Sequence, residues 1–347
     1  MNRKLPSAAR FRTPPPRRMA GLSLIELMIS ITIGLMILSG VAFVFVNTSQ
    51  ARNEVERTSR QIENGRYAVE VIADDLRLAG FYGELNVGAI TAPGALPADQ
   101  CSLTAADWNL WIPLHVQGYD NGAGFDKVTT ADCALADQKA NTDILLIRRA
   151  RTCLADASGC EAVASGKPYV QVSLCAEDVT TQHVLGLQGT ATFDLKKKAC
   201  GTTVADKRQY LVHIYYISTN NGAGVTVPTL KRLELTGGAW STTALVEGIE
   251  EFNVAYGLDT NGNGAPDSYS ASPAATVAAW MSVVSVQLHI LARSLETSPG
   301  YTDAKTYTIG IDAAGDPLTV EPGLGYRRHV YTSLVRLNNP AGRKDLP

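Results

Sequence analysis

The amino-acid sequence predicts an α+β protein, in which a long N-terminal α-helix packs on an antiparallel β-sheet head with a disulfide-stapled, loop-rich region. An apolar N-terminal run that continues into an amphipathic pattern predicts the helix. Alternation of apolar and polar residues in the C-terminal half predicts the sheet. Cysteines clustered between these two parts predict the staples. No helical crossovers separate the predicted strands, which argues against a doubly wound parallel sheet.

The apolar run extends from Leu22 to Val46, and Glu26 is its one charged residue. A helix of this length would span roughly 37 Å, enough to cross a bilayer. Residues 1–21 form a leader without acidic residues and with six basic ones: Arg3, Lys4, Arg10, Arg12, Arg17 and Arg18. Because positive flanks stay in the cytoplasm, we expect one transmembrane segment over 22–46 with a cytoplasmic N-terminus.

A secretory signal peptide and a plain membrane anchor are the two simpler interpretations of this run. The run is longer than the apolar part of a signal peptide, and no A-x-A-like cleavage site follows it. A plain anchor leaves Glu26 unexplained, because a carboxylate inside a spanning helix is costly unless it finds a partner.

The stretch from Arg17 to Glu26 resembles the start of type IV prepilins, which have a basic leader, a glycine, a hydrophobic residue, and glutamate at the fifth position after the cut. The resemblance implies cleavage between Gly21 and Leu22 by a prepilin peptidase, followed by N-methylation of Leu22. It implies a single-pass inner-membrane protein that moves to a pilus at the cell surface on assembly. Its partners would be other major and minor pilins and the inner-membrane assembly platform. Two departures from the family pattern are Leu22, where Phe or Met is usual, and the long leader.

Glu26 has a physical role in this interpretation. After the cut, the new α-amine is a cation at the end of an apolar helix, and Glu26 of a neighbouring subunit could pair with it. Since unpaired charges are costly in a low dielectric, such a pair would set the axial register between subunits.

The helix is predicted to continue to the start of the head. Residues 47–79 contain no proline and one glycine, Gly65. An apolar stripe recurs at helical spacing through Val55, Ile62, Val69, Ile72, Leu76 and Ala79. We expect one helix over 22–79, with Gly80 as its C′ residue and the head over 81–347.

All six cysteines lie in the segment 101–200: Cys101, Cys133, Cys153, Cys160, Cys175 and Cys200. An even number in an exported chain favours disulfides, although the fifteen pairings stay open. The short spacing of Cys153 and Cys160 suggests that these two close a small loop. A zinc site is disfavoured because the sequence has no C-x-x-C and no paired histidines.

Period-two patterns and turn residues predict the strands. Two lie in the loop-rich region, at 143–149 and 169–174, and the others follow it, at 210–218, 229–235, 244–257, 281–293, 306–311 and 329–337. This layout sharpens the resemblance to the large PilW-type minor pilins. Three segments carry it: Ala-Gly-Phe-Tyr-Gly at 79–83, the segment 256–264, and an Arg-Arg pair before the strand that ends at 337.

One head segment resembles the start of an EF-hand calcium loop. Oxygen-bearing side chains occupy its positions 1, 3, 5 and 9, with glycine at 6: Asp259, Asn261, Asn263, Asp267 and Gly264. Ser270 replaces the bidentate glutamate of position 12, and a strand rather than a helix precedes the loop. A plain hairpin turn built on Asn-Gly is the alternative. Ca²⁺ is therefore the one candidate cofactor.

The remaining features argue against catalysis and nucleic-acid binding. The sequence contains no G-x-S-x-G, Walker A or H-E-x-x-H motif. Removing the leader takes six of the 31 basic residues and none of the 33 acidic ones, which leaves a net charge of −8. We expect a non-enzymatic minor pilin that takes part in assembly or priming of a type IV pilus near its tip. The alternatives are a minor pseudopilin of a type II secretion system and a Ca²⁺-dependent adhesin head on the same anchor.

Overall fold

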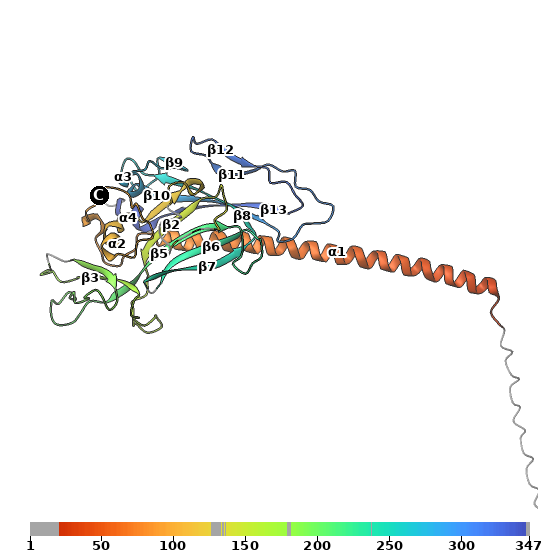
Figure 1. The fold of residues 1–347 in the computed structure, drawn as a ribbon, viewed down its shortest axis with the longest axis horizontal. Coiled ribbons are helices and arrows are strands. Elements are labelled where there is room, and N and C mark those ends of the chain that lie inside the picture. The colour runs from red at the N-terminus through yellow and green to blue at the C-terminus, as the bar shows by residue number, and fades with distance from the viewer. Residues whose placement is uncertain are drawn as a thin grey trace, which may run out of the picture. The chain divides into compact units, whose positions relative to one another are not determined.

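A computed structural model of the chain describes residues 21–125, 133, 135, 137–178, 182–236 and 238–344 (Figure 1). The predicted leader lies outside the described residues, except for Gly21. The chain divides into two compact units, Met1–Val55 and Glu56–Pro347. The second unit, which we call the head, includes the N-terminal helix from Glu56 onward.

The N-terminal helix α1 runs without interruption from Leu24 to Arg77. Ser23 caps its start, because the Ser23 Oγ accepts the backbone N–H of Glu26 at 3.2 Å. The helix is long and apolar enough to cross a membrane by length and composition. Its apolar side chains from Leu24 to Val46 are exposed, with Phe45 73% and Met36 76% accessible. The predicted long N-terminal helix is confirmed, with bounds two residues inside the expected ones.

The face of α1 that packs on the head differs from the predicted stripe. The buried residues of the helix are Gln61, Gly65, Ala68, Ile72, Ala73, Asp75 and Leu76. Ile72, Leu76 and Ala79 are buried as expected, whereas Val55 is 70% and Ile62 42% exposed. The stripe was misassigned because it counted apolar residues alone. The true contact face includes glycine and two polar side chains that find partners in the head.

The larger sheet of the head has seven antiparallel strands. They are β1 (Val116–Tyr119), β2 (Ile144–Ala150), β3 (Pro168–Val172), β4 (His183–Leu187), β5 (Lys207–Ser218), β6 (Thr229–Thr236) and β7 (Ala239–Glu247). The long strand β5 is central, because β2, β3 and β6 all pair with it. In Figure 1, β5, β6 and β7 lie side by side in green to blue-green.

The second sheet has the order β13-β10-β8-β9, and a separate hairpin is formed by β11 and β12. Its strands are β8 (Ile249–Leu258), β9 (Ser268–Ser270), β10 (Val283–Arg293) and β13 (Arg328–Arg336), and the hairpin strands are β11 (Tyr307–Ile311) and β12 (Pro317–Val320). The period-two alternation that predicted the strand over 281–293 is typical of a strand with one buried face. Instead both of its faces are covered, so that even Ser285 and His289 are less than one-tenth exposed.

The run predicted as one strand over 244–257 is two strands, β7 and β8. Gly248 separates them with φ +79°, and a Cβ there would lie 2.7 Å from the Arg293 carbonyl oxygen. The sequence did not predict this turn, because the apolar pattern continues across it and Gly248 alone is a weak turn signal. Short helices complete the head and were not predicted: η1 (Val87–Ala89), α2 (Ala105–Trp111), η2 (Asp120–Gly122), α3 (Val277–Met281) and α4 (Asn338–Lys344).

Helix α4 lies at the end of the described chain and contacts the segment that follows α1. The Asn339 amide donates to the Ala79 carbonyl at 3.1 Å, and the Arg343 guanidinium donates to the Gly80 carbonyl at 3.3 Å. Gly80 has φ +70°, in the left-handed region expected of a residue that ends a helix. Backbone carbonyls after the last turn of α1 are therefore satisfied by side chains from the far end of the chain.

Candidate functional site

The predicted cleavage position lies just before α1. Gly21, Leu22 and Ser23 have non-helical backbone, and the helix begins one residue later. Leu22 is 74% exposed, and no side chain or backbone atom lies within 4 Å of a Cβ built on Gly21. A peptide bond in accessible, non-helical backbone is one that a protease can reach.

Glu26 lies in the first turn of α1, where its negative charge complements the helix dipole. Its backbone N–H is bound by Ser23, and its backbone carbonyl accepts the Ser30 hydroxyl at 2.7 Å. None of the residues that the structure describes forms an ion pair with its carboxylate. The charge is thus presented at the start of an exposed apolar helix.

The surface around Glu26 suits helix-to-helix contact. Ser30 and Gly34 are small residues four positions apart, and a Cβ at Gly34 would meet nothing within 4 Å. Small residues at this spacing let two helices approach closely in a membrane or in a bundle. The exposed apolar side chains on either side need lipid or partner helices to cover them.

Asp75 is the centre of a buried charged cluster that holds α1 on the large sheet. One of its carboxylate oxygens accepts hydrogen bonds from the His213 Nδ1 at 2.6 Å and from the Tyr215 hydroxyl at 2.9 Å. The other pairs with the Arg149 guanidinium. On the far side of the imidazole, the Glu234 carboxylate lies 3.6 Å from the His213 Nε2. The cluster therefore connects α1 with β2, β5 and β6.

The electrostatics of this cluster follow from burial and pairing. Burial raises the pKa of Asp75, but His213 and Arg149 outweigh it and hold that pKa well below its ordinary value. Burial lowers the pKa of His213, but Asp75 and Glu234 outweigh it and the net pKa is raised. The two carboxylates therefore favour the charged imidazolium more than water does around a free histidine.

The late Arg-Arg pair that the sequence singled out forms a second buried cluster. The side chain of Arg328 is fully buried and pairs with Glu250 and, at 3.1 Å, with Asp303. Burial lowers the pKa of Arg328, but these two carboxylates outweigh it and raise that pKa. The cluster links β13 and β8 to the loop that precedes β11, so the motif has a structural role.

The candidate calcium loop folds around its own backbone. The Asp259 carboxylate accepts N–H groups from Gly262 at 2.6 Å and Gly264 at 3.0 Å. Its second oxygen also lies 3.2 Å from the Lys344 ammonium. Burial raises the pKa of Asp259, but these donors outweigh it and lower that pKa.

The other side chains of the loop are engaged in the same way. The Asp267 carboxylate accepts hydrogen bonds from the Thr260 hydroxyl and the Asn261 side-chain amide. The side-chain oxygen of Asn263 accepts the backbone N–H of Ala265. The Lys344 ammonium lies against the Asp259 carboxylate, and the loop oxygens already accept N–H groups. The geometry favours the turn interpretation. Calcium binding stays the alternative prediction, and a titration with Ca²⁺ decides between the two.

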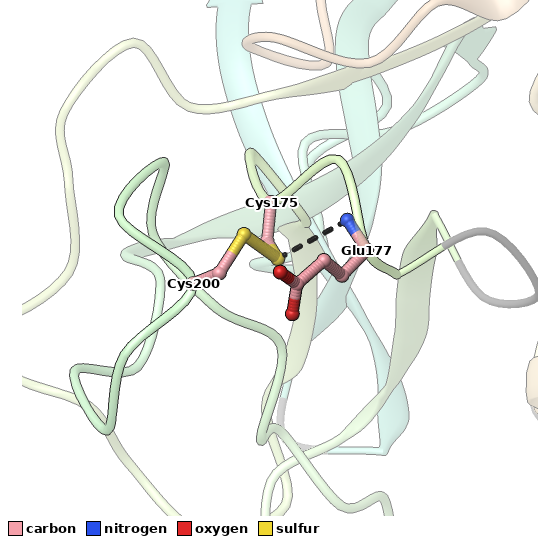
Figure 2. Close-up of side chains that lie close together, drawn as sticks. All are labelled: Cys175, Glu177 and Cys200. Carbon is pink, nitrogen blue, oxygen red and sulfur yellow. Dashed lines mark hydrogen bonds between the residues drawn. A yellow bond between two sulfur atoms is a disulfide. The ribbon is translucent and has the colours of Figure 1, made fainter.

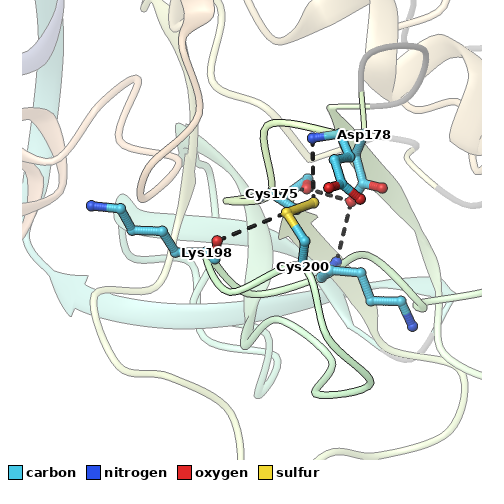
Figure 3. Close-up of a disulfide and its surroundings, with 7 residues drawn as sticks. Cys175, Asp178, Lys198 and Cys200 are labelled. Carbon is cyan, nitrogen blue, oxygen red and sulfur yellow. Dashed lines mark hydrogen bonds between the residues drawn. A yellow bond between two sulfur atoms is a disulfide. The ribbon is translucent and has the colours of Figure 1, made fainter.

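The six cysteines form three disulfides: Cys101–Cys133, Cys153–Cys160 and Cys175–Cys200. The small loop expected between Cys153 and Cys160 is present. Figure 3 shows the third disulfide, where the Asp178 N–H donates to the Cys175 carbonyl at 3.2 Å. These bonds staple segments with few strands, which bury little core of their own.

Cys175, Glu177 and Cys200 bring one ligand-type atom each within 4.8 Å of the others. Figure 2 shows that the two sulfur atoms are bonded to one another and that the Glu177 N–H donates to the Cys175 sulfur at 3.3 Å. Because the thiolate is the form of cysteine that binds metals, the disulfide makes both sulfurs unsuitable as ligands. We therefore interpret Cys175, Glu177 and Cys200 as a structural disulfide with a neighbouring glutamate, not as a metal site.

The sequence pattern led to no site assignment for Asp75 or His213. A signal for Asp75 was present: it lies three residues after Ile72, on the same helical face, so a carboxylate there had to find a buried partner. Which strand would supply that partner is a long-range property that the pattern does not contain.

Two family models match the chain. One, described as Type IV Pilus-assembly protein W, matches residues 214–339, from within β5 to the start of α4. The other, the prokaryotic N-terminal methylation motif, matches residues 16–42 and includes Gly21, Leu22 and Glu26. No curated protein and no solved structure matches the chain.

Proposed function

We propose that this chain, which is a type IV pilin-like protein of the PilW type, is a minor pilin that prepilin peptidase processes and that takes part in assembling or priming a type IV pilus near its tip. The matched families are structural pilus components rather than enzymes. The N-terminal apolar helix and the methylation motif fit a pilin anchored in the inner membrane.

One observation carries the proposal: an accessible Gly21–Leu22 bond directly precedes an exposed apolar helix with a single carboxylate in its first turn. Cleavage there would free an α-amine close to the helix start. Glu26 has no ionic partner among the described residues, so the amine of a neighbouring subunit is a suitable one. The pair would be favourable only when the two helices are in register, since either charge alone is costly in an apolar bundle.

The head contributes through its attachment to the helix. The C-terminal part of α1 is fixed on β2 and β5 by the ion pairs of Asp75 with Arg149 and His213. The head is also large compared with the helix. A bulky head is difficult to repeat along a filament, which favours a position at the tip over one along the shaft. Other pilins and the inner-membrane platform are the partners that follow from this role.

A minor pseudopilin of a type II secretion system would have the same N-terminal motif. The match of residues 214–339 to a pilus-assembly family favours the pilus. A deletion strain separates the two, because loss of piliation with normal protein secretion supports the pilus role, and the reverse result supports the secretion role.

The direct test is the intact mass and N-terminal residue of the full chain recovered from membranes. We expect an N-methylated Leu22 as the first residue, and loss of this product when the prepilin peptidase is absent. A chain that begins at Met1, or one cut near residue 46, would overturn the proposal.

A further inference from the structure

Two loops of the head lie beside the point where α1 enters it. One joins β10 to β11 and the other joins β12 to β13, and we call residues 294–306 and 321–327 the entry loops. The Arg57 guanidinium of α1 donates to the Thr297 carbonyl of the first loop at 3.2 Å. Gly325 of the second loop packs on the first, because a Cβ there would lie 3.3 Å from the Thr297 Cβ. Both entry loops are therefore held against the first head turn of α1.

Leu324 protrudes from the second entry loop in an unfavourable conformation. Its side chain is 65% exposed, and its backbone has φ +61°. The left-handed region is unfavourable for a bulky side chain, so that glycine would suit this position better. The backbone is nevertheless fixed, since the Leu324 carbonyl accepts the Asp303 N–H at 2.8 Å and the Gly323 carbonyl accepts the Arg328 guanidinium at 2.6 Å. A strained, exposed leucine held in place in this way indicates a contact outside the head.

The surroundings of Leu324 have the composition of a membrane interface. Residues 297–302 and 322–326 contain no charged side chain. Two guanidinium groups stack on tyrosine rings of the entry loops, with centroid distances of 3.8 Å for Arg327 on Tyr301 and 3.9 Å for Arg293 on Tyr326. Tyrosine is enriched where membrane and water meet, and tyrosine and arginine both combine an apolar body with a polar end. The entry loops therefore suit the headgroup region of a bilayer.

The length of the chain places the start of the head close to the bilayer. Val46 ends the apolar run and Glu56 begins the head. The backbone between them is helical, so this step measures about 15 Å along the helix axis. Lipid headgroups extend roughly 5–7 Å beyond the hydrocarbon core on each side. In any orientation of the head, its first turn of α1 and the entry loops beside it thus stay near the headgroups.

We propose that the entry loops are a membrane-contact surface, in which Leu324 inserts between phospholipid headgroups while the subunit is anchored in the inner membrane. This inference rests on the anchoring of α1 in the proposed function. The partner is the lipid surface itself rather than a neighbouring pilin. The contact limits the tilt of the head on the membrane, and it ends when the subunit leaves the bilayer for the filament.

The test uses the full chain alone, reconstituted in vesicles of phosphatidylethanolamine and phosphatidylglycerol that contain doxyl-labelled phospholipids as quenchers. One cysteine at a time is introduced and labelled with an environment-sensitive dye without reductant, which preserves the three disulfides. The variants are Leu324→Cys, Leu174→Cys as the matched control and Phe45→Cys as the marker of the anchor. Leu174 is also an exposed leucine, 46% accessible, but it lies beside Glu84 and Leu85, which follow the end of α1.

We expect doxyl groups near the headgroups to quench the dye at Leu324→Cys at least about threefold more strongly than the dye at Leu174→Cys. The dye at Phe45→Cys should be quenched by doxyl groups deep in the acyl chains. Equal quenching at the two leucine positions, with Phe45→Cys quenched, would overturn the membrane-contact surface and leave the anchor intact. An unquenched Phe45→Cys would overturn the anchor as well. A dye at Leu324→Cys that is shielded only after other pilins are added would assign the entry loops to a pilin contact instead.

Two further substitutions separate membrane contact from folding. Leu324→Gly relieves the left-handed backbone and should keep or raise the Tm in detergent, whereas Leu324→Asp places a charge at the tip of the loop. With the dye at Thr302→Cys, an exposed position of the first entry loop, both substitutions should remove most of the quenching. Quenching that persists in both would show that Leu324 does not make the contact.

Discussion

The ring of Tyr331 lies directly on Gly65, so closely that a Cβ at position 65 would come within 2.1 Å of the Tyr331 Cε2. Glycine in a helix interior costs roughly 0.5–1 kcal/mol relative to alanine. Because Gly65 has no side chain, Tyr331 of β13 can pack against the backbone of α1. The contact explains why an otherwise uninterrupted helix has a glycine at this point.

Gly65→Ala should therefore destabilise the head, by about 1–3 kcal/mol, because the ring must shift in a packed interface. Gly342→Ala in α4 is the matched control, since its Cβ would meet nothing within 4 Å and helix propensity should make it neutral or slightly stabilising. Thermal unfolding of the full chain in detergent measures both. Pairing Gly65→Ala with Tyr331→Ala should recover part of the loss, and equal Tm values for the two glycine variants would contradict the role of Tyr331.

Removing the negative charge of Asp75 should destabilise the attachment of α1 strongly. Asp75→Asn removes the counter-charge that Arg149 and His213 share and leaves His213 with Glu234 alone, and breaking a buried ion pair typically costs about 3–5 kcal/mol. Asp74→Asn is the control, because Asp74 pairs with Arg77 at the exposed surface and contributes little. Protease resistance of the head and its Tm are the measurements, and similar values for the two variants would refute the role of the cluster.

The same cluster predicts a pH dependence. The pKa of His213 is raised above its ordinary value of 6.5, so its stabilisation is complete below about that pH and is lost as the pH rises through the folded-state pKa. The pKa of Asp75 is lowered below 3.8, so its contribution is present above that pH and is lost on acidification. The cluster should stabilise the head most between these limits.

Comparison of the wild type with His213→Asn isolates this effect. Asparagine keeps a donor toward Asp75 but does not titrate, while Arg149, Glu234, Tyr215 and Arg232 remain around it. The difference in Tm should shrink as the pH rises from mildly acidic to alkaline values. The comparison is necessary because burial raises the pKa of Asp143 to about 7. Asp143 alone would therefore make the Tm of the wild type fall as the pH rises, as His213 does, and this contribution cancels in the difference between the two proteins. A difference that does not change with pH would show that His213 is uncharged in the folded head.

Glu26→Ala should leave cleavage between Gly21 and Leu22 intact but prevent incorporation into pili. The reason is that cleavage acts on the exposed backbone before α1, whereas incorporation uses the carboxylate. Mass spectrometry of membrane fractions and immunoblots of sheared pili measure the two steps. Glu63→Ala, on the head part of α1, is the control that should leave both unchanged. Normal piliation in the Glu26 variant would contradict the assignment.

Millimolar Ca²⁺ should leave the Tm of the full chain unchanged, because Lys344 already neutralises Asp259 and the loop oxygens accept backbone N–H groups. Asp259→Asn should lower the Tm whether or not calcium is present, and Mg²⁺ serves as the control for ionic strength. A rise in Tm with Ca²⁺ that disappears in Asp259→Asn would instead establish a calcium site.

Local patterns were sufficient to predict the helix, most of the long strands and the prepilin-like N-terminus. The apolar run after Gly21 and the alternation in 283–293 are properties of neighbouring residues, and both led to the correct element type. The capping serine at position 23, three residues before Glu26, was a local signal that went unused.

The rest depended on contacts between distant segments. The Gln61 amide of α1 donates to the Ala292 carbonyl of β10. A polar residue therefore lies on the contact face of α1, where the apolar stripe predicted none. The β7–β8 corner at Gly248 and the unpaired acceptor of Gln117 likewise depend on neighbours far away in the sequence. No periodicity of a single segment contains this information.

The contacts from α4 to Ala79 and Gly80 have a consequence for biosynthesis. The carbonyls after α1 emerge early from the ribosome, but the side chains that satisfy them lie 260 and 263 residues further along the chain. Until Asn339 and Arg343 have been synthesised and translocated, the junction between helix and head lacks these bonds. A chain truncated before α4 would lack both bonds, so the junction between α1 and the sheets of the head would be less stable.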